Sequence, residues 1–151
     1  MDALSDVLRV IRLAGGVFLD AEFTAPWCIV SRVGPEDCPM KELPPSLVAF
    51  HYVIEGRMLV QGDGAALEVR AGEMVLLPRN DPHLLASDAG LAPASPDPLV
   101  QQVEGGLMRL EHGGGGAPTR LVCGFVGADV RRHPLLDALP AVFALDLNGK
   151  S

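Results

Sequence analysis

Hydrophobic residues near the start of the chain recur at the spacing of an amphipathic helix. The i, i+3, i+4, i+7 pattern is followed by Leu4, Val7, Leu8 and Ile11. Gly15-Gly16 follows this stretch after three further residues, and glycine commonly ends a helix. The sequence therefore predicts an N-terminal helix that stops before these two glycines.

After the glycines, the pattern changes to short apolar runs separated by Gly, Pro, Asn and Asp, which is typical of strands. The expected strands are 17–23, 27–32, 47–54, 57–61, 66–69, 73–77, 107–111 and 120–126. Two of these runs flank Gly62-Asp63-Gly64, which predicts a hairpin. One helix followed by many short strands favours a mainly β sandwich or barrel.

The remaining segments are expected to be a loop, a short helix and an apolar end. Residues 87–106 are rich in Pro, Ala, Ser and Asp and predict a long exposed loop. Residues 133–139 carry Pro134 near their start and predict a short C-terminal helix. Residues 142–147 form a final apolar stretch. No internal repeat or boundary divides the sequence, so we expect residues 1–151 to form a single domain.

Charge and cysteine content narrow the classes of function. The 151 residues include 12 Lys and Arg against 19 Asp and Glu, a net charge of −7, which disfavours direct binding to nucleic acid. No segment reaches the apolar length of a membrane span, and the acidic start does not fit a secretory signal. Three cysteines without CxxC spacing do not suggest a disulfide framework. We therefore expect a cytoplasmic protein with no membrane partner.

The most specific motif runs from Gly72 to His83. It resembles the second cupin motif, Gly-x5-Pro-x-Gly-x2-His, with Gly72, Pro78 and His83 in register. Asn80 replaces the second glycine of that motif, and asparagine tolerates the left-handed backbone conformation that glycine usually supplies there. The resemblance implies a cupin-like double-stranded β-helix, a jelly-roll barrel, into which His83 points.

The first cupin motif is matched only at its end. Residues 51–56, His-Tyr-Val-Ile-Glu-Gly, fit the closing Val-x-x-Gly. The His-x-His and Glu that hold a metal in cupin enzymes belong before this point, where residues 43–49 read Leu-Pro-Pro-Ser-Leu-Val-Ala. A cupin dioxygenase or isomerase with three His and a carboxylate on its metal therefore loses support.

A closer resemblance covers nearly the whole chain. Five segments, each a weak signal alone, come in the order found in the cupin-type N-terminal sensor domain of AraC-type bacterial transcription regulators. These segments are 50–56, 71–83, 113–116, 121–125 and 133–140. In that family the barrel senses a small molecule, helices after the barrel mediate dimerisation, and a C-terminal helix-turn-helix pair binds DNA. The resemblance implies that this chain is the sensor half, with a small-molecule effector as partner. DNA is then bound only through a missing C-terminal domain, and self-association is at most a weak homodimer.

Three residues are expected to converge inside the barrel. Alternation places His51 on one face of strand 47–54 and Cys123 on one face of strand 120–126, and the cupin motif directs His83 inward. The proposed ligand pocket contains these three residues together with Tyr52 and Trp27.

Several hypotheses stay open for this site. Two His and one Cys form a candidate site for zinc or another divalent transition metal, with water or effector as a fourth ligand. Equally, His51 and His83 are hydrogen-bonding anchors of an apolar pocket. A plainer interpretation makes all three satisfied interior groups.

The leading functional hypothesis is an effector-binding regulatory domain without catalysis, and catalytic residues are therefore not assigned. The alternative is a solitary small cupin metalloprotein or enzyme that uses a reduced site of His51, His83 and Cys123.

Overall fold

Strands dominate the structure. The computed structural model describes residues 13–31, 46–62, 64–96, 99–102, 108–128 and 134–148. Seven strands form one sheet in the order β11-β6-β3-β10-β1-β9-β8. Their bounds are β1 Leu13–Thr24, β3 Ser46–Glu55, β6 Glu73–Leu77, β8 Val100–Gln102, β9 Met108–Gly113, β10 Pro118–Ala128 and β11 Phe143–Asp146.

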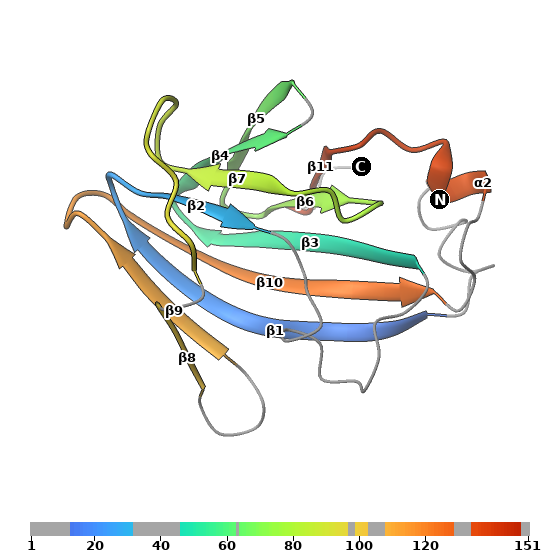
Figure 1. Cartoon of the computed structure of the whole chain (residues 1–151), viewed down its shortest axis with the longest axis horizontal. Coiled ribbons are helices and arrows are strands. Elements are labelled where there is room, and N and C mark those ends of the chain that lie inside the picture. The colour runs from blue at the N-terminus through green and yellow to red at the C-terminus, as the bar shows by residue number, and fades with distance from the viewer. Residues whose placement is uncertain are drawn as a thin grey trace.

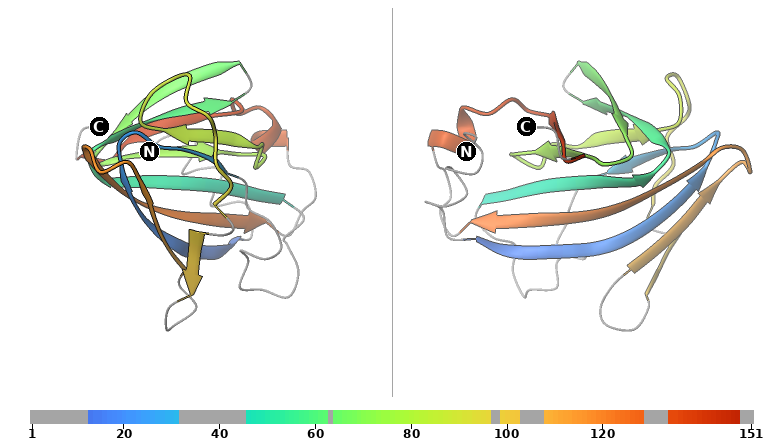
Figure 2. Two further views of the ribbon diagram at one scale, coloured as in Figure 1. Left: turned by 60° about the vertical axis from the view of Figure 1, so that its left-hand side comes forward. Right: turned by 180° about the vertical axis from the view of Figure 1, so that it is seen from behind.

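The second sheet has four strands in the order β2-β7-β4-β5. Their bounds are β2 Cys28–Ser31, β4 Arg57–Gly62, β5 Ala65–Arg70 and β7 His83–Ala86. β1, β10 and β3 run side by side as the long strands, and the four-stranded sheet lies over them (Figures 1 and 2). These two facing sheets form the jelly-roll barrel that the sequence predicts.

A continuous apolar core fills the space between the sheets. Val53, Leu121 and Phe125 contribute from the larger sheet, and Met58 and Leu85 contribute from the smaller one. All five side chains are fully buried, and their removal from water is the main favourable term that holds the two sheets together.

Turn residues act as the sequence predicts. β4 and β5 pair as a hairpin, from Arg57 opposite Arg70 to Gly62 opposite Ala65. Asn80 has a φ of 53°, so it takes the left-handed conformation expected for the position where it replaces glycine. This turn separates β6 from β7 and sets the direction in which β7 begins at His83.

The structure does not support the helical predictions in full. Residues 1–12 lie outside the described part of the chain, but Leu13 and Ala14, expected at the end of the N-terminal helix, already belong to β1. Near the C-terminus, the described helix is the single turn α2, Pro134–Asp137, shorter than the predicted 133–139. The strand pairing of β1 with β10 begins at Leu13 opposite Ala128, so sheet formation overrides the local helical preference there.

The predicted long exposed loop is partly built into the sheets. Ala94 exchanges backbone hydrogen bonds with Cys28 and Val30 of β2, at 2.9 and 3.1 Å. Further along, β8 pairs with β9. The sequence does not predict these pairings, because the proline and polar residues of this segment indicate turns and do not identify the short paired stretches between them.

Candidate functional site

The candidate site lies between the two sheets, where three predicted residues meet. Cys123 of β10 is paired directly with His51 of β3 in the larger sheet. His83 reaches the same place from the start of β7 in the smaller sheet. All three are buried, with 4% or less of each residue exposed.

A chain of hydrogen bonds links these residues. His51 Nδ1 lies 2.8 Å from Cys123 Sγ, and His51 Nε2 lies 2.7 Å from His83 Nε2. His83 Nδ1 lies 2.9 Å from the backbone oxygen of Asp81. The sequence predicted the two histidines and the cysteine but missed the Asp81 carbonyl, because a backbone acceptor leaves no signature in residue type.

The Asp81 carbonyl fixes the direction of every proton in this chain when both rings are neutral. A carbonyl oxygen only accepts, so His83 Nδ1 donates to it and His83 Nε2 is left as an acceptor. His51 Nε2 therefore donates to His83, which leaves His51 Nδ1 to accept from the Cys123 thiol. The result is an uncharged chain of hydrogen bonds from Cys123 to Asp81, in which each donor meets an acceptor.

Burial favours this uncharged state. It lowers the pKa of His51 well below the ordinary value, and the neighbouring His83 lowers it further. Burial also lowers the pKa of His83, although the hydrogen bond to the Asp81 backbone and the Asp81 charge act in the opposite direction. A proton added to the pair is therefore better accommodated on His83 than on His51.

A glycine on β4 leaves room for the side chain of His83. A Cβ added at Gly62 of β4 would come within 3.3 Å of the His83 Cβ. A larger residue at this position would press against His83. The sequence indicates Gly62 only as a turn residue, because the approach of β4 to His83 is a tertiary contact.

Two other predicted pocket residues do not join this chain. Tyr52 is next to His51 in β3, so its side chain lies on the other face of the sheet from the two histidines. Trp27 is buried, with 2% exposed, and its ring stacks on Phe23 at 4.0 Å between centroids.

Trp27 lies away from the two histidines. In the β2–β7 pair, Ser31 is opposite His83. At the other end of this pair, the Trp27 backbone N–H donates to Ser87 Oγ, and the Ser87 backbone N–H donates to the Trp27 carbonyl, both at 2.9 Å. Four residues of extended chain separate the two positions by roughly 13 Å. Trp27 Nε1 is buried without a hydrogen-bond partner, so an unmet donor lies in this other part of the barrel.

The donor geometry does not fit a three-ligand metal site. One ring nitrogen of His51 faces Cys123, and the opposite nitrogen faces His83. A single ion cannot take ligands on both sides of one imidazole ring. Within the described ranges, no group of three or more His, Cys, Asp or Glu has the arrangement needed to hold a metal ion.

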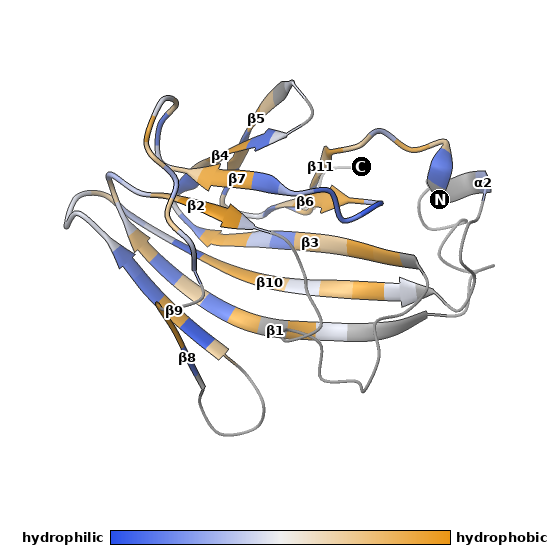
Figure 3. Ribbon diagram, in the orientation of Figure 1, coloured by the Kyte–Doolittle hydropathy of each residue, from blue (hydrophilic) through white to orange (hydrophobic). Residues whose placement is uncertain are grey.

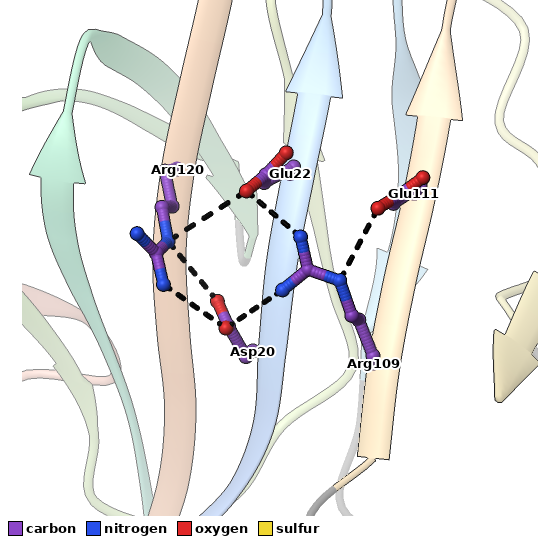
Figure 4. Close-up of polar contacts among 5 residues, drawn as sticks. All are labelled: Asp20, Glu22, Arg109, Glu111 and Arg120. Atoms are coloured by element: carbon purple, nitrogen blue, oxygen red, sulfur yellow. Dashed lines mark hydrogen bonds and ion pairs between the residues drawn. The ribbon is translucent and has the colours of Figure 1, made fainter. Parts of the chain in front are cut away.

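A charged cluster lies on the outer face of the larger sheet, across β9, β1 and β10. Arg109 reaches Asp20 at 2.9 Å, Glu22 at 2.8 Å and Glu111 at 3.2 Å, and Arg120 reaches Asp20 at 3.2 Å (Figure 4). Hydrophilic residues are correspondingly seen along β9 and the adjoining end of β1 (Figure 3). Asp20 and Glu22 share one face of β1 because side chains alternate along a strand, but the arginines that meet them come from β9 and β10.

A hollow of about 470 Å³ opens beside this cluster and is lined by Glu22, Glu111 and Arg120 among others. These three charges are already paired within the cluster. Recognition of a ligand at this hollow would compete with those ion pairs. We therefore place the candidate site inside the barrel.

Comparison with a family model identifies the family of this chain. The family model described as Cupin matches residues 2–151, so the chain belongs to the cupin family. A solved structure of a cupin protein from Bacteroides fragilis is similar, with 14% identity and a TM-score of 0.40 over 91% of this chain and 85% of that chain. No curated protein matches the chain. Among the described residues, no helix has both the length and the apolarity to cross a membrane.

Proposed function

We propose that this cupin is the small-molecule-sensing domain of an AraC-type transcription regulator. The observation that carries the binding role is the buried chain from Cys123 through His51 to His83, set in an otherwise apolar interior. A few polar groups within apolar walls are the usual composition of a small-molecule site. The five ordered sequence segments support the regulatory role.

In this proposal, an effector enters the barrel and exchanges hydrogen bonds with the two histidines. Because His51 and Cys123 belong to one sheet and His83 to the other, such a ligand contacts both sheets at once. A change in their separation is the physical link that this proposal makes to a domain attached beyond the barrel. Coupling of this kind requires two states with different affinity for the effector.

The binding role is tested by thermal unfolding in the presence of a panel of small ketones, phenols and carboxylic acids. At least one compound is expected to raise the unfolding midpoint of the wild-type chain. The same compound should lose most of its effect in His83→Gln, while His112→Gln should keep it. A panel without any shift, or an equal shift in His83→Gln, would contradict the proposed site.

The regulatory role is tested by sequencing the native gene past the codon for Ser151. We expect the reading frame to continue for about a hundred residues with two helix-turn-helix patterns. A stop codon directly after Ser151 would instead favour a solitary cupin.

The alternative is a small metal-binding cupin or enzyme. The facing Nε2 atoms of His51 and His83 are the feature that favours it, because imidazole nitrogens are common zinc ligands. Metal analysis of the purified chain decides this point. One transition metal ion per chain that is lost in both His83→Gln and Cys123→Ser would establish the three-ligand site and overturn our assignment of the hydrogen bonds.

A further inference from the structure

Cys123, His51 and His83 follow one another along the buried chain of hydrogen bonds. This is the order of a nucleophile, its base and a residue that orients the base. A thiol nucleophile is activated by a base within about 2.6–3.2 Å, and that base is in turn held by a third group. Here Cys123 Sγ lies 2.8 Å from His51 Nδ1, and His51 Nε2 lies 2.7 Å from His83 Nε2. The geometry therefore does more than satisfy the hydrogen bonds of the two histidines: it also matches that of an activated thiol.

The hydrogen bond from His83 to Asp81 determines which nitrogen of His51 acts as a base toward the Cys123 thiol. His83 Nδ1 is bound to the Asp81 carbonyl at 2.9 Å, so its Nε2 accepts from His51. The lone pair of His51 Nδ1 then faces Cys123. His83 acts on the thiol only through His51, which makes it a positioning residue.

We propose that Cys123 is a nucleophilic thiol that captures small apolar α,β-unsaturated carbonyl compounds inside the barrel, with His51 as its base and His83 as the residue that positions His51. This inference rests on the proposed function, because a ligand must enter the barrel to reach a thiol that is 4% exposed. It names the chemical class of the effector.

The addition is balanced without any further reactant. Cys123 Sγ forms a bond to the β-carbon of the ligand, and the π electrons of the C=C bond move toward the carbonyl oxygen. The thiol proton passes to His51 Nδ1 and is then returned to the α-carbon. The net result is the addition of S–H across the double bond, with no oxidant and no leaving group.

Apolar side chains lie on the same faces of β10 and β3 as the thiol and its base. Leu121 and Phe125 lie on the same face of β10 as Cys123, and both are fully buried. Val53 lies on the same face of β3 as His51 and is also fully buried. A short hydrocarbon group next to the reacting carbon would pack against these side chains.

A second cysteine provides an internal control. Cys28 of β2 is as buried as Cys123, with 3% exposed, and burial raises the pKa of its thiol. No side-chain hydrogen bond reaches Cys28 within the part of the chain that the structure describes. The two thiols therefore match in burial but differ in contact with a base.

The test measures adduct formation on the folded chain with methyl vinyl ketone, using peptide mass spectrometry to assign each adduct. Cys123 should react at least about tenfold faster than Cys28, since a positioned base contributes about 10²–10⁴-fold in favourable cases. His51→Gln should lower the rate at Cys123 toward that at Cys28. His83→Gln should change the pH profile of the Cys123 rate, which a merely structural role would not do.

Several outcomes would overturn the inference. Equal rates at Cys123 and Cys28 in the wild-type chain would do so whatever the variants show. A faster Cys123 that is unchanged in a folded His51→Gln variant would remove the role of the base. If His51→Gln does not fold, the wild-type ratio and the pH profile of His83→Gln still decide the question.

The saturated analogue butanone separates this inference from the proposed function. A thermal shift with butanone but no adduct on Cys123 would refute the nucleophile and leave the sensing role intact. No adduct, together with no shift from butanone or any compound of the panel, would refute both. An adduct on Cys123 that requires His51 would support both.

Discussion

Both buried histidines are neutral, and every ring nitrogen of the two side chains takes part in a hydrogen bond. His51 donates to His83 and accepts from Cys123, and His83 donates to the Asp81 carbonyl. A second proton on His51 would leave two donors facing each other or displace the thiol proton. The site is therefore satisfied in one protonation state, and acid should disrupt it.

At the residue scale, we predict that the chain loses stability as the pH falls below about 6.5. The pKa of His51 is lowered in the folded state from an ordinary value of 6.5, and that of His83 is lowered too. The unfolded state therefore binds more protons in this window, so stability is present above pH 6.5 and is lost toward the lowered pKa. Each such proton contributes at most about 1.4 kcal/mol per pH unit.

Urea unfolding between pH 7.5 and pH 5 checks this prediction. The His51→Gln variant, which has no titrating ring at this position, should show a shallower dependence on pH than the wild-type chain. His112→Gln, on β9 and away from the site, serves as the matched control and should keep the wild-type slope. Parallel curves for the wild-type chain and His51→Gln would show that the buried ring does not control acid stability.

At the element scale, glycines let strands turn where a side chain would clash or strain the backbone. Gly56, between β3 and β4, has a φ of 81°, and a Cβ placed there would lie 2.4 Å from the backbone oxygen of Pro118. Gly64, in the β4–β5 turn, has a φ of 72° but would meet nothing within 4 Å. The two positions share a backbone conformation and differ in the space around them.

This pair predicts unequal costs for the same substitution. Gly64→Ala should lower the free energy of unfolding by about 1 kcal/mol, the penalty for the left-handed conformation alone. Gly56→Ala should cost about 1–3 kcal/mol more, because the backbone around Pro118 must shift to admit the methyl group. Chemical denaturation of both variants measures the difference, and equal losses would mean that the close approach at Gly56 relaxes freely.

At the scale of the whole molecule, the two sheets enclose the site and leave their outer faces open to other molecules. The outer face of the larger sheet, near β1 and β9, carries charged residues that are paired among themselves. Apolar side chains on the outer face of β3 and β6, such as Val48 and Leu76, pack with Phe143 and Leu145 of β11. Among the described residues, the exposed large hydrophobic side chains are scattered: Val17 on β1, Val30 on β2, Ile54 on β3 and Leu147 after β11.

We therefore predict that the 151-residue chain is monomeric or only weakly dimeric in solution. Sedimentation equilibrium over a range of concentrations measures this directly. A chain extended through the segment encoded after Ser151 should associate more tightly if the regulator proposal holds. A tight dimer of the 151-residue chain alone would contradict this assignment of the dimerisation elements.

Local patterns in the sequence predicted much of the fold. Alternation identified most strands, Gly62-Asp63-Gly64 predicted the β4–β5 hairpin, and Asn80 was expected to replace a left-handed glycine. Alternation also gave the inward faces of His51 and Cys123, since the side-chain period of a strand is a local property. The helix expected before Gly15 fails at Leu13 and Ala14, because pairing with β10 extends β1 to that point.

The assembly of the site was decided by contacts between residues distant in sequence. His51 is 72 residues from Cys123 and 32 residues from His83, and periodicity does not say which strands pair or how sheets face each other. For the same reason the sequence placed Tyr52 and Trp27 with the histidines, although one lies on the opposite face and the other near the far end of β7. The sequence by itself determined the residue types and their faces. The pairing of β3 with β10 and the packing of β7 over them determined that two rings and a thiol form one chain.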